Sequence, residues 1–146
     1  MSSSPLRRDD LGFLLAKATQ RWNDLLTEGF AAAGYPDVRP SYGSVLLPLY
    51  EEDGLQMGEL ARRSRLSKQT MTSLVRRVER DGLVVRSSDP ADARATLVSL
   101  TPRARAFEPV AGRVLEGVHA RVRDRLPPEA IATVQEALRE LARLAD

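Results

Sequence analysis

The stretch from Leu55 to Thr101 constrains the fold most, because helix-forming and strand-forming patterns follow one another there with almost no spacer. Residues 57–63 have the spacing of a short amphipathic helix, and residues 64–66 leave room only for a tight turn. Ser67 is a favourable N-cap, because its hydroxyl can accept hydrogen bonds from the free N–H groups of a first helical turn. Gly82 is a natural residue to follow a helix end. The stretch therefore predicts two short helices joined by a sharp turn.

The second of these helices, from Ser67 to Gly82, predicts two faces of opposite character. At about 100° per residue, one face is apolar and carries Met71, Leu74, Val75 and Val78. The other face is polar and suits base edges and phosphates, with a predicted DNA-contact set of Ser67, Lys68, Gln69, Thr70, Thr72, Ser73, Arg76 and Arg77. The alternative is an ordinary solvated helix, which the coincidence of turn, cap, polar face and following strands disfavours.

After Gly82 the pattern becomes extended, with two β-branched runs around Asp89 and Pro90 that predict a hairpin. Asp92 and Arg94 lie two residues apart, so both side chains can share one side of a strand and the carboxylate can orient the guanidinium. An arginine held at a hairpin tip is well shaped to enter a minor groove, whereas the simpler alternative is a surface ion pair with Asp92. The predicted hairpin contacts are Arg86, Ser87, Ser88, Asp92 and Arg94.

These residues together resemble the signature of the MarR family of transcriptional regulators. The resemblance rests on Leu60-Ala61, Leu66-Ser67, Thr70, residues 75–86, Asp89-Pro90, Asp92, Arg94 and Leu100-Thr101. Departures are small: Ala104 stands where the family often has glycine, and Met71 where it often has valine. The resemblance implies a mostly α fold with a small β-wing, in which a winged helix-turn-helix lies between dimerisation helices. It also implies a homodimer that binds pseudo-palindromic double-stranded DNA, and it favours minor-groove insertion of Arg94.

The distribution of charge fits this expectation better than the formal net charge of +2 does. Residues 55–105 hold 11 Lys/Arg and 5 Asp/Glu, which gives this region +6 and the rest of the chain −4. Only 5% of residues are aromatic, so a large stacking platform for single-stranded nucleic acid is not available. The absence of cysteine excludes disulfides, thiolate zinc sites and thiol redox sensing.

The flanking segments predict helices with long apolar stripes. We expect a polar tail at 1–8, a dimerisation helix and loop at 9–40, the winged helix-turn-helix at 41–101, and dimerisation helices at 102–146. The first helix should end near Ala33, and its stripe comprises Leu11, Leu14, Leu15, Ala18, Trp22, Leu25, Leu26 and Phe30. Pro48 predicts a kink in a helix at 41–52, and Pro109 predicts a bend or break after the Thr101 cap.

The two C-terminal helices have comparable stripes. These comprise Phe107, Val110, Val114, Val118, Val122 and Leu126, then Ile131, Val134, Leu138, Leu141 and Leu144. Because the central module is compact by itself, these stripes are expected to bury against each other and against a second copy of the chain.

A small-molecule effector is a further expectation, since regulators of this type often bind small aromatic or anionic ligands. Residues of suitable type and place are Phe13, Lys17, Arg21, Trp22, Tyr42, Tyr50 and His119. The simpler interpretation of Phe13 and Trp22 is core packing, and that of His119 is a satisfied packing group.

Other functional classes find little support. The chain has no phosphate-binding glycine loop, nucleophile elbow or histidine metal pair, so no enzymatic activity, metal or cofactor is expected. No stretch is apolar enough to span a membrane and residues 1–8 lack the core of a secretion signal, so the expected location is cytoplasmic. A repressor released by its ligand is the leading hypothesis. A protein-interaction module and a ligand-independent regulator remain alternatives, although the polar face of the second helix argues against the first.

Overall fold

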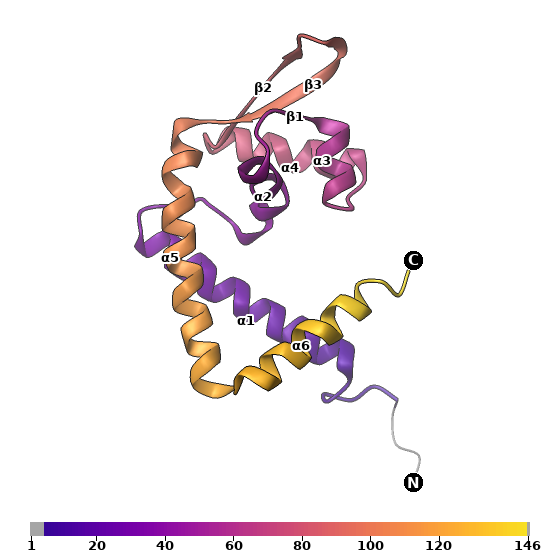
Figure 1. Cartoon of the computed structure of the whole chain (residues 1–146), viewed down its shortest axis with the longest axis vertical. Coiled ribbons are helices and arrows are strands. Elements are labelled where there is room, and N and C mark those ends of the chain that lie inside the picture. Colours follow the sequence, from indigo (N-terminus) through magenta and orange to yellow (C-terminus); the bar gives the residue numbers. More distant parts are fainter. Residues whose placement is uncertain (1–4, 146) are drawn as a thin grey trace.

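A computed structural model describes residues 5–145, so part of the predicted 1–8 tail, and Asp146, lie outside the described residues. The helical elements are α1 (Leu11–Ala32), the 3-10 turn η1 (Pro40–Tyr42), α2 (Gly43–Glu51), α3 (Met57–Arg63), α4 (Lys68–Arg80), α5 (Pro102–Arg125) and α6 (Pro128–Leu141). The strands are β1 (Leu55–Gln56), β2 (Val84–Asp89) and β3 (Asp92–Leu100). The predicted fold class, mostly α with a small β-wing and helices on both sides of a winged helix-turn-helix, is confirmed (Figure 1).

The winged module consists of α2, α3 and α4 packed against a small antiparallel sheet with strand order β1-β3-β2. Strand β2 pairs with β3 from Val84 opposite Leu100 to Asp89 opposite Asp92. β1 was not predicted, because two residues carry no alternating pattern and only their pairing with β3 makes them a strand. The core lies between helices and sheet, and its completely or almost completely buried members include Val45, Leu49, Leu60, Met71, Val75, Val78, Leu83, Val84 and Val98.

The helix-turn-helix forms for the local reasons that the sequence indicates. The Ser67 hydroxyl accepts the main-chain N–H of Thr70 at 3.1 Å, which satisfies one free donor of the first turn of α4. The predicted apolar face of α4 is buried throughout. Gly82 follows α4 with a φ of +80°, a conformation that a residue with a side chain rarely adopts. The chain therefore leaves α4 sharply and enters β2.

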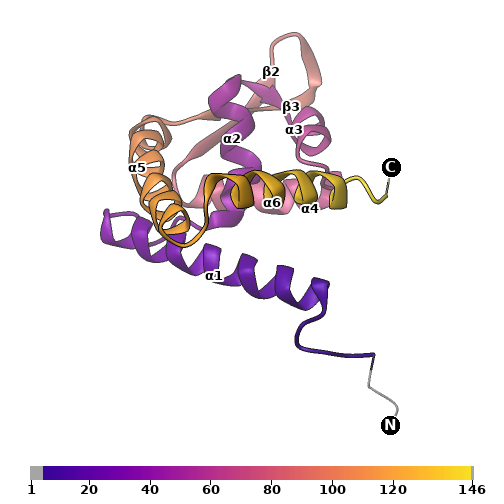
Figure 2. The ribbon, with the colours of Figure 1, turned by 60° about the horizontal axis from the view of Figure 1, so that its bottom comes forward.

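Helices α1, α5 and α6 form an open scaffold beneath this module (Figures 1 and 2). α1 and α5 approach closely at Gly29, where an added Cβ would lie only 2.5 Å from a methyl carbon of Val114. The rings of Phe30 and Phe107 meet edge to face nearby, with centroids 5.0 Å apart. α5 then runs away from the module, and the chain turns at its far end into α6.

Neither internal proline ends its helix. Pro48 has no N–H to donate to the carbonyl of Ser44 four residues earlier, and that carbonyl instead accepts the Ser64 hydroxyl at 2.5 Å. Of the bend or break expected at Pro109, the break is wrong, because α5 continues through this residue. Pro109 and Arg105 are both exposed, so water can satisfy the carbonyl that lacks its helical partner.

Much of the apolar surface of the scaffold is uncovered within one chain. Of the predicted α1 stripe only Phe30 is buried, while Leu11 is 58% and Leu14 is 50% exposed. α6 has no buried residue at all, and its Val134 and Leu138 lie open. Among the described residues no helix has the length and apolar character needed to cross a membrane.

Candidate nucleic-acid interface and adjoining cavity

The polar face of α4 lies on the outside of the module. Seven of its eight predicted contact residues are exposed, and Thr72 is half-buried. Two of the eight serve the helix start, because the Ser67 hydroxyl accepts the N–H of Thr70 and donates to the Thr70 hydroxyl oxygen at 2.8 Å. The Thr72 hydroxyl donates to the carbonyl of Lys68. Within residues 5–145, no hydrogen bond or ion pair engages the side chains of Lys68, Gln69, Ser73, Arg76 and Arg77.

The wing ends in a two-residue turn, Pro90-Ala91, that a carboxylate holds in place. Asp89 accepts the N–H of Ala91 at 2.9 Å and the side-chain amide of Gln56 at 2.7 Å. These bonds, from Gln56 first and Ala91 second, hold the pKa of the Asp89 carboxyl below its ordinary value. Gln56 thus ties the tip of the wing to β1, a role that only long-range pairing creates.

Arg94 lies exposed on β3 beside this turn, but Asp92 does not orient its guanidinium. The Asp92 carboxylate accepts the main-chain N–H of Arg94 at 3.0 Å, and no ion pair joins the two side chains in the described structure. The expectation of an aimed guanidinium is therefore wrong. An aspartate side chain readily accepts the main-chain N–H two residues later. The Asp92 carboxylate therefore fixes the backbone of the strand and does not orient the Arg94 guanidinium.

Arg86 has a partner that the sequence analysis missed. The Glu79 carboxylate on α4 accepts both the N–H of Arg86 at 3.2 Å and its guanidinium at 3.0 Å. This clamp fixes β2 relative to α4. Ser87 and Ser88 follow on the same strand and are exposed, as are Asp92 and Arg94, although the Asp92 carboxylate accepts the N–H of Arg94.

Two arginines of α3 are likewise engaged within the chain. Glu59 accepts Arg62 at 2.5 Å and Arg63 at 2.8 Å, and Arg63 also pairs with Glu52. The hydrogen bonds from Arg62 and Arg63 lower the pKa of Glu59 to about 2. These arginines stabilise the start of the helix-turn-helix, whereas α4 presents the unpaired cations.

A cavity of about 270 Å³ lies where α1, α2 and α5 meet. Three of the predicted effector residues, Trp22, Tyr42 and Tyr50, line it. The remaining wall is mostly apolar and includes Leu26, Phe30, Val38, Leu46, Phe107, Ala111 and Leu115. Arg39 is the one charged side chain of the lining, and sequence reasoning missed it because it lies in a loop without periodicity.

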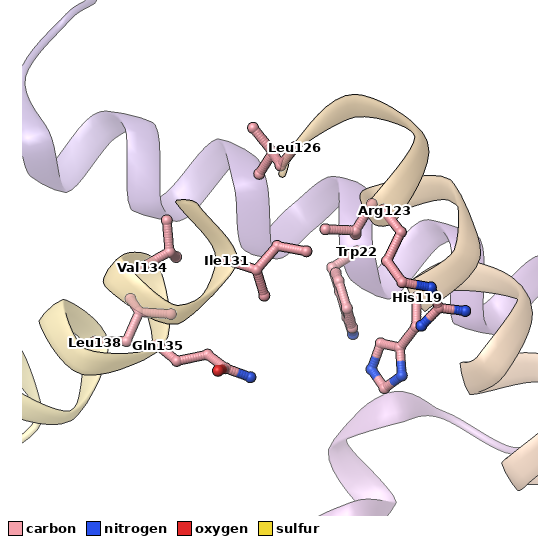
Figure 3. A pocket seen from close by; sticks show the side chains of 9 residues that line it. Trp22, His119, Arg123, Leu126, Ile131, Val134, Gln135 and Leu138 are labelled. Atoms are coloured by element: carbon pink, nitrogen blue, oxygen red, sulfur yellow. The ribbon is translucent and has the colours of Figure 1, made fainter. Parts of the chain in front are cut away.

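The other predicted effector residues lie elsewhere, so the seven do not form one pocket. His119 faces a second cavity of about 360 Å³ between α1, α5 and α6, with its ring 5.8 Å from that of Trp22 (Figure 3). Phe13 lies at a shallow surface near the N-terminal end of α1, and Lys17 lies over its ring at 5.5 Å. Arg21 is exposed and lines neither cavity.

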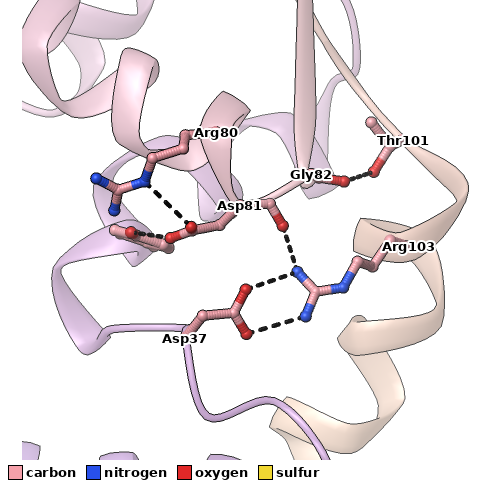
Figure 4. A network of polar contacts seen from close by, with 7 residues as sticks. Asp37, Arg80, Asp81, Gly82, Thr101 and Arg103 are labelled. Carbon is pink, nitrogen blue, oxygen red and sulfur yellow. Dashed lines mark hydrogen bonds and ion pairs between the residues drawn. The ribbon is translucent and has the colours of Figure 1, made fainter.

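A polar network joins the C-terminal end of α4 to the scaffold (Figure 4). The Tyr42 hydroxyl donates to the Asp81 carboxylate at 2.5 Å. Arg103, in the first turn of α5, donates to both carboxylate oxygens of Asp37 at 3.0 and 3.2 Å and to the carbonyl of Asp81. The Thr101 hydroxyl donates to the carbonyl of Gly82 at 2.6 Å. Carbonyls at the end of α4 are thereby satisfied by the start of α5.

The pKa values of Tyr42 and Asp81 favour a hydrogen bond from the neutral hydroxyl to the charged carboxylate. Burial raises the pKa of Tyr42, and its bond to Asp81 raises it further, so the hydroxyl keeps its proton and donates. Burial alone would raise the pKa of Asp81, but the hydrogen bonds from Tyr42 and Arg80 outweigh burial and the pKa lies below its ordinary value. The carboxylate is therefore charged and accepts from both neighbours.

The sequence is similar to those of known transcriptional regulators. A family model described as "MarR family" matches residues 37–95. The HTH-type transcriptional regulator TtmR of Methylorubrum extorquens is 39% identical over 64 residues, which are 44% of this chain and 33% of TtmR. The matched stretch thus spans about one third of that curated relative.

Solved structures resemble the chain over nearly its whole length. A probable transcriptional regulator from Pseudomonas aeruginosa has a TM-score of 0.78 and 28% identity, covering 91% of this chain and 97% of that one. The transcriptional repressor CouR, bound to a 23-mer DNA duplex, has a TM-score of 0.72 and 26% identity, covering 96% and 100%. Signature, fold and matches agree: residues 37–95 match the MarR family, and the chain as a whole resembles solved transcriptional regulators.

Proposed function

We propose that this chain is a DNA-binding transcriptional regulator that places α4 in a major groove and the tip of the wing in the adjacent minor groove. The observation that carries the proposal is the outward face of α4, where Lys68, Gln69, Arg76 and Arg77 are exposed and unpaired within residues 5–145. Exposed Arg94 continues this surface onto the wing. CouR, a relative of the same fold, is bound to a DNA duplex, which supports the same use here.

The proposed functional unit is a homodimer. Residues 41–101 would form the reading module, and 9–40 with 102–146 the dimerisation region. The exposed apolar side chains of α1 and α6, such as Leu14 and Leu138, support this assignment because a second copy would remove them from water. A two-fold dimer would bind a pseudo-palindromic site, with its two α4 helices about one helical turn of DNA apart.

The proposed activity is repression that a small aromatic or anionic ligand relieves. The mostly apolar cavity, with Trp22, Tyr42, Tyr50 and Arg39 in its wall, has the composition for such a ligand. A ligand releases DNA only if it binds the non-binding arrangement more tightly. In this proposal the protein acts through binding rather than catalysis, and it acts in the cytoplasm. The ligand-independent regulator and the protein-interaction module remain the alternatives.

The test is a titration of the purified protein with the duplex directly upstream of its own gene, in the presence of an unrelated duplex and at several salt concentrations. Saturable binding that survives the competitor supports an operator-reading regulator. Equal, strongly salt-dependent binding to both duplexes would mean that the module binds DNA but that its site lies elsewhere. Absence of binding to either duplex would overturn the proposal and favour the protein-interaction module.

A further inference from the structure

Tyr42 both lines the cavity and is hydrogen-bonded to the end of α4. Its side chain is among those that line the cavity between α1, α2 and α5, yet the residue is only 2% exposed. Its hydroxyl donates to Asp81, the residue that follows α4. The ring has little freedom to move alone, because the module core surrounds it. A change in the cavity that displaces the ring therefore acts on the end of α4.

Asp81 is in turn held by the scaffold. Its carbonyl accepts Arg103 of α5, and Arg103 is fixed from the other side by two bonds to Asp37, in the loop after α1. The guanidinium also lies over the ring of Tyr35 at 5.2 Å. α5 thus fixes the Asp81 backbone while the cavity wall holds its carboxylate. The end of α4 lies between two attachments that belong to different elements.

The Tyr50 hydroxyl bonds to a different element from the Tyr42 hydroxyl. It also lines the cavity and also has a bonded hydroxyl, but this hydroxyl donates to the carbonyl of Ala104 in α5 at 2.6 Å. Tyr50 therefore joins α2 to the scaffold and has no bond to α4. Of these two tyrosines in the cavity wall, only Tyr42 connects the cavity to the DNA-facing helix.

We infer that the Tyr42 hydroxyl is the regulatory link through which occupancy of this cavity changes the position of α4, with Asp81 and Arg103 as the positioning residues that convert a ring displacement into a tilt of the reading module on α5. The inference rests on the proposed DNA-binding function and deepens it by naming the route of regulation. Its physical basis is that packed cores respond as units, so a displaced side chain moves what it is bonded to.

The test needs no identified ligand, because a substitution can fill the cavity. Ala111 of α5 lines the cavity and is half-buried, so Ala111→Leu adds apolar volume there. The change is made in the wild-type, Tyr42→Phe and Tyr50→Phe backgrounds. Each Phe variant keeps its ring and loses only a hydroxyl. Leu115→Phe serves as a second filling substitution if Ala111→Leu does not fold by circular dichroism.

Two quantities are measured for every protein: affinity for the operator duplex, and hydrogen exchange of the Gly82 and Leu83 amides, which bond to carbonyls of Glu79 and Val78 near the end of α4. In wild-type protein we expect filling to change operator affinity about tenfold and to change this exchange. In Tyr42→Phe the change should fall below about threefold, while in Tyr50→Phe it should persist.

Either of two results would overturn the inference: a full effect of filling in the Tyr42→Phe background, or no effect on affinity and exchange in wild-type protein. If wild-type protein binds no operator, the proposed function fails separately. The exchange measurement still decides the link in that case, because it requires a change on filling in wild-type protein and none in Tyr42→Phe.

Discussion

Carboxylates divide the arginines of the winged module into two groups. Arg63 and Arg86 are paired with glutamates of α3 and α4, so they hold elements together and would have to break bonds to contact phosphate. Arg76 and Arg94 have no such partner in the described structure. Unpaired cations can bind DNA without that cost, so we expect Arg76 and Arg94 to contribute more to affinity than Arg86.

At the residue scale, the start of α4 gives a prediction on stability. Ser67→Ala removes the hydroxyl that accepts the N–H of Thr70, and should lower the free energy of unfolding by about 1 kcal/mol. Urea unfolding of the purified protein measures this loss. Ser73→Ala is the control, because its exposed hydroxyl caps nothing, and it should change stability by less than about 0.5 kcal/mol. Equal losses in the two variants would contradict the capping role.

Glu59 gives a prediction on pH. Its folded pKa of about 2 lies below the ordinary 4.5, so its pairing stabilises the fold above about pH 4.5, and this stabilisation is lost as pH falls through 2. Glu59→Gln should therefore lower the melting temperature at pH 6 more than at pH 2.5, and salt should reduce the difference. Glu140→Gln, on exposed α6, is the control. A pH-independent effect of Glu59→Gln would contradict this account.

At the element scale, the helix-turn-helix was predictable because its signals are local. The Ser67 cap, the three-residue turn and Gly82 lie within the segment they define, and α3 has the predicted bounds while α4 starts and ends within about two residues of them. β1 and the network of Asp37, Asp81 and Arg103 depend on residues far apart in the chain. The spacing of apolar residues along the chain does not indicate contacts between distant residues. These pairings were therefore seen only in the structure.

The effects of the two helix-internal prolines were also hard to predict from local sequence. A proline inside a helix predicts disruption because it removes one hydrogen bond, yet the cost depends on what the freed carbonyl finds next. For Pro48 the replacement donor is the hydroxyl of Ser64, which is distant in sequence. For Pro109, both this residue and Arg105 are exposed, so the freed carbonyl is open to water. The candidate cavity was predicted only in part for a similar reason, since Arg39 lies in an irregular loop.

The end of α4 gives a prediction at this scale. Gly82→Ala places a Cβ where nothing clashes, the nearest atom being 3.7 Å away, so its cost comes from the positive φ alone. We expect a loss of about 1–2 kcal/mol in the free energy of unfolding. Gly58→Ala, in the first turn of α3 with open space around it, should be neutral or stabilising. Thermal unfolding of both variants tests the prediction, and an unchanged Gly82→Ala protein would contradict it.

In the molecule as a whole, the scaffold and the winged module differ in how much of their apolar surface one chain can bury. The module buries its own core, whereas α1 and α6 leave apolar side chains in water. We therefore expect the scaffold to reach its stable form only as a dimer, and the spacing of two α4 helices to follow from the way two scaffolds pack.

Leu138→Glu tests dimerisation. The side chain is 45% exposed within one chain, so a charge there is tolerable in a monomer but costly at an apolar interface. Sedimentation equilibrium should show a dissociation constant raised at least about tenfold relative to wild-type protein. Val85→Glu, at a wing position that is 50% exposed, should remain dimeric. Dimers of unchanged affinity in Leu138→Glu would show that this face of α6 is not the interface.

Whether α4 and the wing read DNA is tested by measuring operator affinity. Wild-type, Arg94→Ala, Arg76→Ala and Arg139→Ala proteins are compared on the operator duplex and on variants of its sequence. Arg139 lies on α6 and, within the part of the chain that the structure describes, pairs only with Glu136, which makes it the matched control. We expect at least about tenfold weaker binding for Arg94→Ala, a changed sequence preference for Arg76→Ala, intact dimers in both, and wild-type behaviour for Arg139→Ala. Wild-type affinity and specificity in both Arg94→Ala and Arg76→Ala would contradict the assignment of α4 and the wing as the DNA-reading surface.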